Sequence, residues 1–390
     1  MRDHINTAAK KRYDIFCKIV DNFGDIGVCW RLAKQLANEH HLQVRLFIDD
    51  FASASKIIPE LDFAKASQQI NGIEICVWPT SAINPAEVVI ETFACGLPDD
   101  FIRKMVQNKS IWINLEYLSA ENWVSDFHAK PSPHPTLAIT KHYFFPGFED
   151  DTGGLIREKN ITQTYNTQNL NCHPDKGQNL VTSTALDSDP RRNDNDKSTL
   201  KISLFCYLNA PVEDLLTALQ ANNHAAFVYV PASSILQNIA KFFGKDSLEI
   251  GETLTRKNLT VQVLPFLSQA DYDQLLHSCD LNFVRGEDSW VRAIWAGKPF
   301  IWQPYIQTEN THLEKLNAFL ATFYANFEQK EMLCEAHQCW SAGQLPNDVL
   351  QRYLNNLPAT QAYTLAQAKQ LTAQTDLAAK LVIFCNNARL

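Results

Sequence analysis

The strongest constraint on the fold is a rhythm that recurs along the chain: a short apolar run, a turn that contains glycine, and an amphipathic helical segment. Its first instance is an apolar run over residues 13–20, a turn over 21–27 and a helical pattern over 28–38. Strands that alternate with helical segments of this length are typical of βα units around a parallel sheet. The chain is therefore expected to adopt an α/β fold.

The rhythm occurs in two blocks. The first block adds four predicted strands, at residues 43–48, 73–78, 88–92 and 110–115. The second block contains five predicted strands and three predicted helices, with strands at 200–207, 226–230, 261–264, 281–284 and 300–302 and helices at 212–220, 270–278 and 289–296. Because 390 residues are too many for one typical core, we expect two Rossmann-like domains.

A polar segment separates the two blocks. It is rich in Asn, Gln, Thr, Asp and Ser, and such a stretch buries too little apolar surface to offset its ordering entropy. We expect an N-terminal domain over 13–157, a disordered insertion over 158–198 and a C-terminal domain over 199–360. A long helix over 360–384 is expected to carry the last residues, 361–390, back towards the N-terminal domain. Two facing domains of this kind enclose a cleft.

Charge and composition exclude several classes of protein. The chain has 35 basic and 43 acidic residues, a net charge of −8, and no long basic block that would follow a phosphate backbone. The N-terminal residues lack the apolar core of a signal peptide, and no stretch reaches the ~18 apolar residues of a membrane span. The ten cysteines occur singly, without a Cys-x-x-Cys pair. We expect a cytoplasmic protein with reduced thiols that binds neither nucleic acid nor membrane.

The first candidate site is the loop 21–27, after the first predicted strand. In open α/β sheets ligands bind at the carboxyl ends of strands, where Gly24 and Gly27 would let the backbone approach a ligand. These two glycines match neither a dinucleotide fingerprint nor a phosphate loop. Asp21 and Asp25 would repel a pyrophosphate, but either would suit a base that faces a nucleophile. The alternative is that one aspartate caps a helix and the other forms a turn.

The second candidate site is the segment 285–289, between a predicted strand and the helix that follows. Gly286, the free N–H groups of the helix start and the Ser289 hydroxyl form a site for nucleotide phosphates. Glu287 and Asp288 beside an anion require compensation, from a sugar hydroxyl or a cationic acceptor. In the alternative interpretation, Asp288 and Ser289 are plain N-caps.

The third candidate site is the segment 264–269, which follows another strand of the C-terminal block. Recognition of a flat base requires an aromatic face, which Phe266 offers, and a polar edge partner, which Gln269 offers. The alternative is that Phe266 belongs to the core. The metal-binding Asp-x-Asp pattern occurs at 187–189, 194–196 and 271–273. We discount all three, because two lie in the polar insertion and the third is expected to cap a helix, and we predict no metal.

Taken together, these segments resemble the bacterial elongation factor P arginine rhamnosyltransferases. The resemblance rests on ordered matches at 21–32, 114–123, 144–148, 203–207, 264–266 and 285–289, within roughly residues 13 to 310. It implies a GT-B fold, in which two Rossmann-like domains face each other. It also implies inverting transfer of L-rhamnose from TDP-β-L-rhamnose, without a cofactor, to an arginine of elongation factor P. The resemblance further implies that this modification activates the factor for rescue of ribosomes stalled at polyproline.

The resemblance also implies roles for individual residues. Asp25 corresponds to the catalytic carboxylate, Glu287 to its supporting acid and Asp21 to a second essential aspartate. The donor site implied by the resemblance contains Phe205, Tyr207, Phe266, Gln269, Asp288 and Ser289. To these the candidate loops add Asn22, Phe23, Gly24, Arg285 and Gly286.

Other functions are compatible with the same fold. A GT-B enzyme with a lipid or glycan acceptor, a sugar-nucleotide epimerase and a non-catalytic nucleotide-sugar-binding protein all remain open. The paired aspartates argue against the last of these, because a mere binding protein gains nothing from carboxylates near phosphates.

Overall fold

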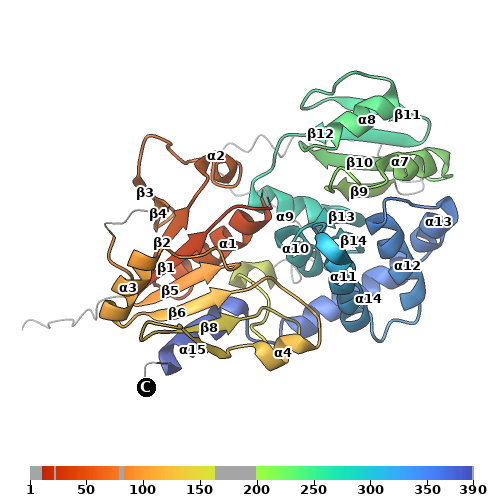
Figure 1. The fold of residues 1–390 in the computed structure, drawn as a ribbon. Coiled ribbons are helices and arrows are strands. Elements are labelled where there is room, and N and C mark those ends of the chain that lie inside the picture. The colour runs from red at the N-terminus through yellow and green to blue at the C-terminus, as the bar shows by residue number, and fades with distance from the viewer. Residues whose placement is uncertain (1–10, 22, 79–82, 163–198, 389–390) are drawn as a thin grey trace, which may run out of the picture.

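The computed structural model describes residues 11–21, 23–78, 83–162 and 199–388, and its core consists of two sheets (Figure 1). The first sheet has the order β3-β4-β2-β1-β5-β6-β8-β7, and only its edge strands β3 and β7 are antiparallel to their neighbours. Its strands are β1 Arg12–Cys17, β2 Gln43–Ile48, β3 Ser67–Ile70, β4 Ile73–Val77, β5 Val88–Thr92, β6 Ile111–Leu115, β7 Pro131–Pro133 and β8 Thr140–Phe144. The parallel strands follow the Rossmann order, with the switch point between β1 and β5.

The second sheet repeats this plan with the order β11-β12-β10-β9-β13-β14. Only β11 is antiparallel, and the switch point lies between β9 and β13. The strands are β9 Leu200–Leu204, β10 Ala226–Pro231, β11 Thr253–Arg256, β12 Leu259–Leu264, β13 Leu281–Arg285 and β14 Phe300–Gln303. The predicted α/β class with two Rossmann-like domains is confirmed.

Helices cover both sheets. Those of the first half are α1 Gly24–Asn38, α2 Phe51–Ala54, α3 Asp99–Asn108 and α4 Trp123–Phe127. Those of the second sheet are α7 Val212–Ala221, α8 Leu236–Phe243, α9 Gln269–Ser278 and α10 Asp288–Ala296. The C-terminal helices are α11 Thr311–Phe323, α12 Lys330–Ser341, α13 Asn347–Asn355, α14 Leu357–Leu371 and α15 Leu377–Asn387, and short 3-10 turns occur at Lys159–Thr162 and Thr308–Asn310.

Two strands end three residues earlier than predicted, and both ends lie at the carboxyl edge where ligands bind in such sheets. The strand predicted over 13–20 stops at Cys17, because the N–H groups of Ile19 and Val20 donate to the side chains of Asp49 and Asp25 instead of a neighbouring strand. The strand predicted over 200–207 stops at Leu204. The residues that follow Cys17 and Leu204 therefore form loops, and their side chains are available to line a binding site.

The long helix predicted over 360–384 is wrong. The chain breaks between α14 and α15, where the Asp376 side chain caps α15 by accepting the N–H of Ala379 at 3.0 Å. The expected return to the N-terminal domain is made by α15. Its Leu377 N–H donates to the Leu155 carbonyl at 2.9 Å, and Phe384 packs against Phe144. Figure 1 shows α15, in dark blue, beside β8 of the first sheet.

The polar insertion predicted over 158–198 begins too early. Residues 158–162 pack against the folded protein, since Glu158 forms ion pairs and a 3-10 turn follows it. The rest of the insertion, 163–198, lies outside the described residues. Within the described part of the chain, no helix combines the length and the apolar character needed to cross a membrane.

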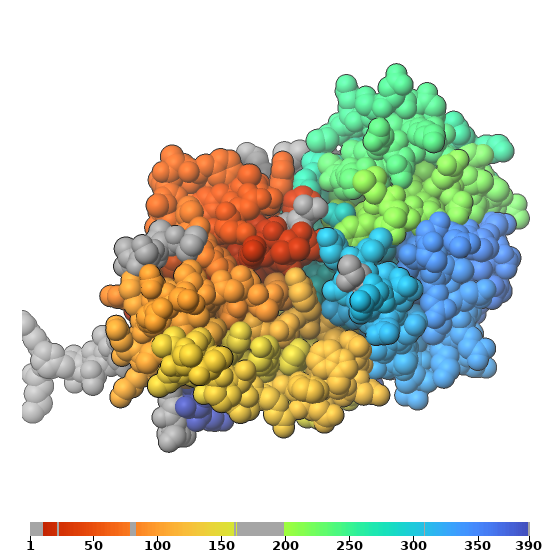
Figure 2. Space-filling view, in the orientation of Figure 1, coloured from red at the N-terminus to blue at the C-terminus, as the bar shows by residue number. Residues whose placement is uncertain are grey.

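The two halves of the chain meet at the carboxyl ends of their parallel strands. Helix α1 contacts α10, and α10 also contacts α9 and α14 (Figure 1). In the space-filling view of Figure 2, the red and orange surface of the first half meets the green and blue surface of the second along a seam. The switch points of both sheets therefore face one interdomain region, which is where such folds bind ligands.

Candidate active site

Asp25 is the most firmly held carboxylate of the N-terminal wall. It lies in the first turn of α1 and is 1% exposed. Its Oδ2 accepts the N–H groups of Val20 and Asp21 at 2.7 and 2.8 Å, and its Oδ1 accepts the Tyr117 hydroxyl at 3.1 Å. These bonds fix the orientation of the carboxylate. The capping interpretation is wrong for both aspartates, because the N-cap of α1 is Phe23 and no side chain caps the helix.

Asp21 bridges the two domains. Its Oδ2 accepts the hydroxyl of Tyr207, from the other domain, at 2.8 Å. Burial raises the pKa of this carboxyl, while the Tyr207 hydrogen bond and the charge of Arg285 oppose the rise. Two glycines make room for it. A Cβ at Gly24 would lie 2.7 Å from Asp21 Oδ2, and one at Gly286, where φ is +60°, would lie 3.0 Å away.

Glu287 faces Asp25 from the C-terminal wall. Its Oε2 accepts the Leu118 N–H at 2.9 Å, so adjacent residues of the loop after β6 hold both carboxylates. Burial raises the pKa of Glu287 to about 7, against the opposing effects of Lys315 and the Leu118 hydrogen bond. The Lys315 ammonium lies 5.4 Å from the centre of the Tyr117 ring. Burial lowers the pKa of Lys315, while the charges of Glu287, Glu121 and Glu116 oppose the fall.

Two neighbouring cavities lie between the domains. We name the first the Phe266 cavity and the second the Asp25 cavity. The Phe266 cavity is lined by Asp21 and by ten predicted donor-site residues: Phe23, Gly24, Phe205, Tyr207, Phe266, Gln269, Arg285, Gly286, Asp288 and Ser289. The Asp25 cavity is lined by Asp25 and Glu287, with Phe93, Tyr117, Tyr305, His312 and Lys315 around them.

The two cavities share part of their walls. Asp21, Gly24 and Gly286 line both. A ligand that fills the Phe266 cavity therefore also lies beside the Asp25 cavity, which contains Asp25 and Glu287. The predicted Asn22 lies outside the described residues.

Aromatic rings and the guanidinium groups of Arg31 and Arg285 line the Phe266 cavity. The Phe266 ring is partly exposed rather than a core residue, and it lies 4.9 Å from the Phe23 ring of the opposite domain. The Arg285 guanidinium lies over the rings of Phe205 and Tyr207, at 4.3 and 4.7 Å. This surface combines flat apolar faces with a cation, which suits a base attached to phosphates.

The two polar residues predicted to face the ligand have partners within the protein. The Ser289 hydroxyl donates to the Arg285 carbonyl and accepts the Arg285 N–H at 3.1 Å. The Gln269 amide donates to the Gly27 carbonyl at 3.0 Å and accepts from Lys34 at 3.0 Å. Neither Asp288 nor Ser289 caps α10, because its N-cap is Glu287 and makes no side-chain cap bond.

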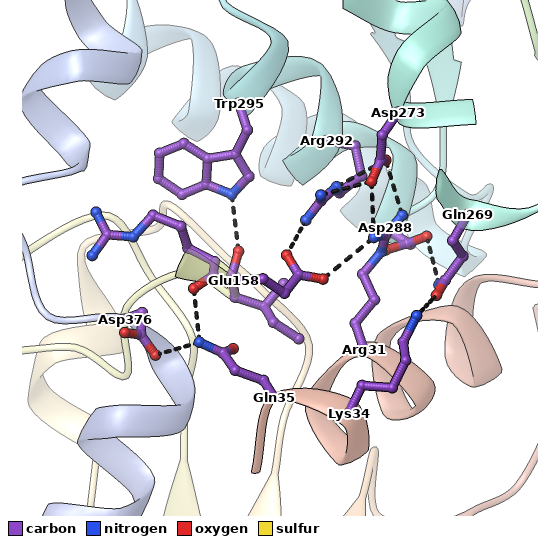
Figure 3. A network of polar contacts seen from close by, with 12 residues as sticks. Arg31, Lys34, Gln35, Glu158, Gln269, Asp273, Asp288, Arg292, Trp295 and Asp376 are labelled. Carbon is purple, nitrogen blue, oxygen red and sulfur yellow. Dashed lines mark hydrogen bonds and ion pairs between the residues drawn. The ribbon is translucent and has the colours of Figure 1, made fainter. Parts of the chain in front are cut away.

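Asp288 belongs to a buried network of ion pairs between the domains (Figure 3). Arg31 of α1 contacts Asp288 through Nε at 2.6 Å and Asp273 through Nη2 at 3.0 Å. Arg292 of α10 contacts Asp273 at 2.7 Å and also pairs with Glu158. The two guanidinium groups lower the pKa of Glu158 to about 2.

The structure separates the two aspartates of the 271–273 motif. Asp271 pairs with Ser268, the N-cap of α9, while Asp273 binds the two arginines. The prediction that this motif caps a helix is wrong, because the N-cap of α9 is Ser268, whose side chain accepts the Asp271 N–H. The motifs at 187–189 and 194–196 lie outside the described residues. Across the described ranges, no three His, Cys, Asp or Glu side chains gather in a way that could hold a metal ion.

Sequence reasoning missed three residues of the site. Tyr117 follows β6, and the rule that ligands bind at the carboxyl ends of parallel strands was a signal for it. Arg31 lies on the same helical face as Gly27, between Trp30 and Leu32, and an arginine on a buried face signals an ion pair. No local signal pointed to Lys315, because α11 is brought to the cleft by the tertiary fold.

Comparisons with known proteins agree with this geometry. The sequence profile of a family described as elongation factor P (EF-P) rhamnosyltransferase EarP matches residues 13–386. A protein-arginine rhamnosyltransferase from Pseudomonas putida is 39% identical over 386 residues, covering 97% of this chain and 100% of the relative. Another from Shewanella oneidensis is 36% identical over 393 residues, covering 95% of this chain and 97% of the relative.

Solved structures show the same architecture. One, from work on the structural basis of EarP-mediated arginine glycosylation of translation elongation factor EF-P, has a TM-score of 0.66 and 30% identity, and the match covers 97% of this chain and 99% of that one. The glycosyltransferase VinC in complex with dTDP shares the fold, with a TM-score of 0.52 at 12% identity over 96% of this chain and 100% of that one. The chain therefore belongs to the family of elongation factor P arginine rhamnosyltransferases, enzymes of the GT-B fold.

Proposed function

We propose that this enzyme transfers L-rhamnose from TDP-β-L-rhamnose to an arginine of elongation factor P, with inversion at the anomeric carbon. The observation that carries the proposal is the pair of adjacent cavities. One is lined by aromatic rings and two guanidinium groups, the other by the carboxylates of Asp25 and Glu287, and they share Asp21, Gly24 and Gly286. A donor and an acceptor can meet at this shared wall. The family relationship supports rhamnose and elongation factor P as the two substrates.

The donor would occupy the Phe266 cavity. The thymine base would stack on Phe266, in the place where Phe23 now lies against it. The pyrophosphate would lie near Arg285 and the N-terminus of α10, whose free N–H groups and helix dipole favour an anion. The sugar would then point towards Asp21 and the Asp25 cavity.

The acceptor would enter the Asp25 cavity. An arginine side chain is a poor nucleophile, because its pKa exceeds about 12 and its lone pairs are delocalised. Two carboxylates facing one space can hold a guanidinium in line with the anomeric carbon. Glu287 would orient it, and Asp25 would take a proton as the bond to carbon forms.

The bond changes follow from this arrangement. A guanidinium nitrogen forms a bond to the anomeric carbon from the side opposite the phosphate, and the bond from that carbon to the phosphate oxygen breaks. The leaving TDP carries away the electron pair, and the nitrogen loses a proton to Asp25. Arg285 and the N-terminus of α10 would stabilise the charge that grows on TDP.

The proposal is tested by incubating the purified enzyme with elongation factor P and TDP-β-L-rhamnose and recording the intact mass of the acceptor. The expected result is the addition of one deoxyhexose, mapped by fragmentation to one arginine. The matched control is an acceptor in which that arginine is replaced by lysine, which should gain no mass. An unchanged mass of the native acceptor, or equal transfer to the lysine variant, contradicts the proposal. A lipid or glycan acceptor would leave elongation factor P unmodified.

A further inference from the structure

Asp288 poses an electrostatic problem for the proposed donor site. Its carboxylate lines the Phe266 cavity, beside the α10 N-terminus where the pyrophosphate is proposed to lie. A bare carboxylate at that place would repel a pyrophosphate, because like charges a few ångströms apart are strongly unfavourable in a partly buried site.

Arg31 removes this repulsion, and it does so from the other domain. Its Nε lies 2.6 Å from Asp288 Oδ1, and the residue is 2% exposed. The close approach depends on Gly27, since a Cβ there would lie 3.1 Å from Asp288 Oδ2. Among the described residues, the hydrogen bond that the Oδ2 atom accepts is a long one, of 3.4 Å, from the Gln269 amide. Asp288 can therefore accept a hydrogen bond from a ligand hydroxyl through Oδ2 while its charge is neutralised at Oδ1.

The surroundings of Arg31 are balanced in charge. In the described part of this network the cations are Arg31, Lys34 and Arg292, and the carboxylates are Glu158, Asp273 and Asp288. Arg292 shares Asp273 and Glu158 with Arg31, as Figure 3 shows, but it does not line the Phe266 cavity. Arg31 alone of the two arginines joins the network to the proposed donor site.

We infer that Arg31 is a positioning residue for the nucleotide-sugar: it orients the Asp288 carboxylate and cancels its charge, so that the Phe266 cavity accepts a pyrophosphate. This inference rests on the proposed donor. It also means that the donor site is complete only when α1 of the N-terminal domain lies against α10 of the C-terminal domain.

The test compares the binding of TDP, by calorimetry, to the full-length enzyme and to Arg31→Met, Arg31→Lys and Arg292→Met. Arg31→Met should raise the Kd for TDP at least about tenfold, because it leaves Asp288 uncompensated. Arg31→Lys keeps the positive charge, so its Kd for TDP should rise less than that of Arg31→Met. Arg292→Met is the matched control, because it removes ion pairs to the same Asp273 and Glu158. It should change the Kd by less than about twofold, with a fall in melting temperature similar to that of Arg31→Met.

A second comparison, made in the Asp288→Asn variant, distinguishes a positioning role of Arg31 from a general loosening of the domain interface. In Asp288→Asn the charge that Arg31 compensates is absent. Adding Arg31→Met to Asp288→Asn should therefore change the Kd for TDP by less than about twofold beyond Asp288→Asn alone.

Two results overturn the inference alone: equal losses of TDP affinity in Arg31→Met and Arg292→Met, or a full additional loss when Arg31→Met is added to Asp288→Asn. If the native enzyme fails to bind TDP at all, the proposed donor is wrong and the inference falls with it. The native measurement thus distinguishes the two failures.

Discussion

Single side chains in the cleft are held by short chains of contacts. The Tyr117 ring stacks on Phe93 with ring centres 4.0 Å apart, and its hydroxyl donates to Asp25. Phe93 has φ of +54°, a left-handed conformation that is costly for a phenylalanine and recurs at functional sites. The strained Phe93 thus supports Tyr117, and Tyr117 orients the proposed base.

Replacing Tyr117 by Phe tests this role. The variant keeps the ring stacking but removes the hydroxyl that donates to Asp25 at 3.1 Å. We expect kcat to fall about tenfold, with the KM for TDP-β-L-rhamnose unchanged, because Tyr117 does not line the Phe266 cavity. Steady-state kinetics with varied donor provide the measurement. A rise in donor KM with unchanged kcat would instead place Tyr117 in donor binding.

Glu287 makes stability depend on pH. Burial raises its pKa from 4.5 to about 7, so between these values the folded state binds more protons than the unfolded state. The stabilisation from the protonated form is complete below pH 4.5 and is lost as the pH rises through 7.

The variant Glu287→Gln stays neutral at every pH. Its free energy of unfolding should therefore fall less than that of the native enzyme between about pH 5 and about pH 8, by up to about 3 kcal/mol. Urea unfolding at the two pH values gives the difference. Equal falls in both proteins would show that Glu287 does not titrate in this range.

Among the helices and strands, the sequence predicted most accurately the central strands, which are buried on both faces of the sheet. The predicted strands at 43–48 and 88–92 coincide with β2 and β5, which are central and largely apolar. The edge strands β3, β7 and β11 and the inner strand β8 were missed, because they are short, rich in polar residues and carry little hydrophobic periodicity. The break between α14 and α15 was also missed. Asp376 can be recognised as the N-cap of α15 only when the turn that precedes it is known.

Helix α15 ties the end of the chain to the first domain, so its effect should be on stability rather than chemistry. Leu381 is 0% exposed and lies in the main core, far along the chain from the cleft residues. Leu381→Ala should reduce the free energy of unfolding by about 2 to 5 kcal/mol, through the cavity it leaves. At temperatures where the variant is folded, kcat should match that of the native enzyme. A large loss of kcat without a loss of stability would contradict this separation.

For the molecule as a whole, the site is a product of both domains. The local sequence was enough to predict the loops on each wall, because glycines and carboxylates that directly follow a predicted strand indicate a ligand-binding loop. It could not identify the contacts across the cleft, such as Tyr207 with Asp21 or Arg31 with Asp288, because these residues lie 186 and 257 positions apart in the chain. For the same reason, only the structure revealed that Lys315 lies in the site.

The proposed reaction uses residues from both walls of the cleft. Asp25 lies on the first wall and Glu287 on the second, and the loop after β6 holds both through Tyr117 and Leu118. The proposed donor cavity opens beside them. The central claim is that Asp25 takes the proton from the acceptor arginine.

The most direct test of that claim is a single-turnover measurement of rhamnose transfer to elongation factor P by Asp25→Asn, with TDP binding measured in parallel. The asparagine retains a carbonyl oxygen that can accept the hydrogen bonds to Val20 and Asp21, but it cannot serve as a base. The account predicts that the rate falls by a factor of at least about 100 while the Kd for TDP stays within about twofold. A variant that transfers rhamnose at close to the native rate with normal TDP binding would contradict it.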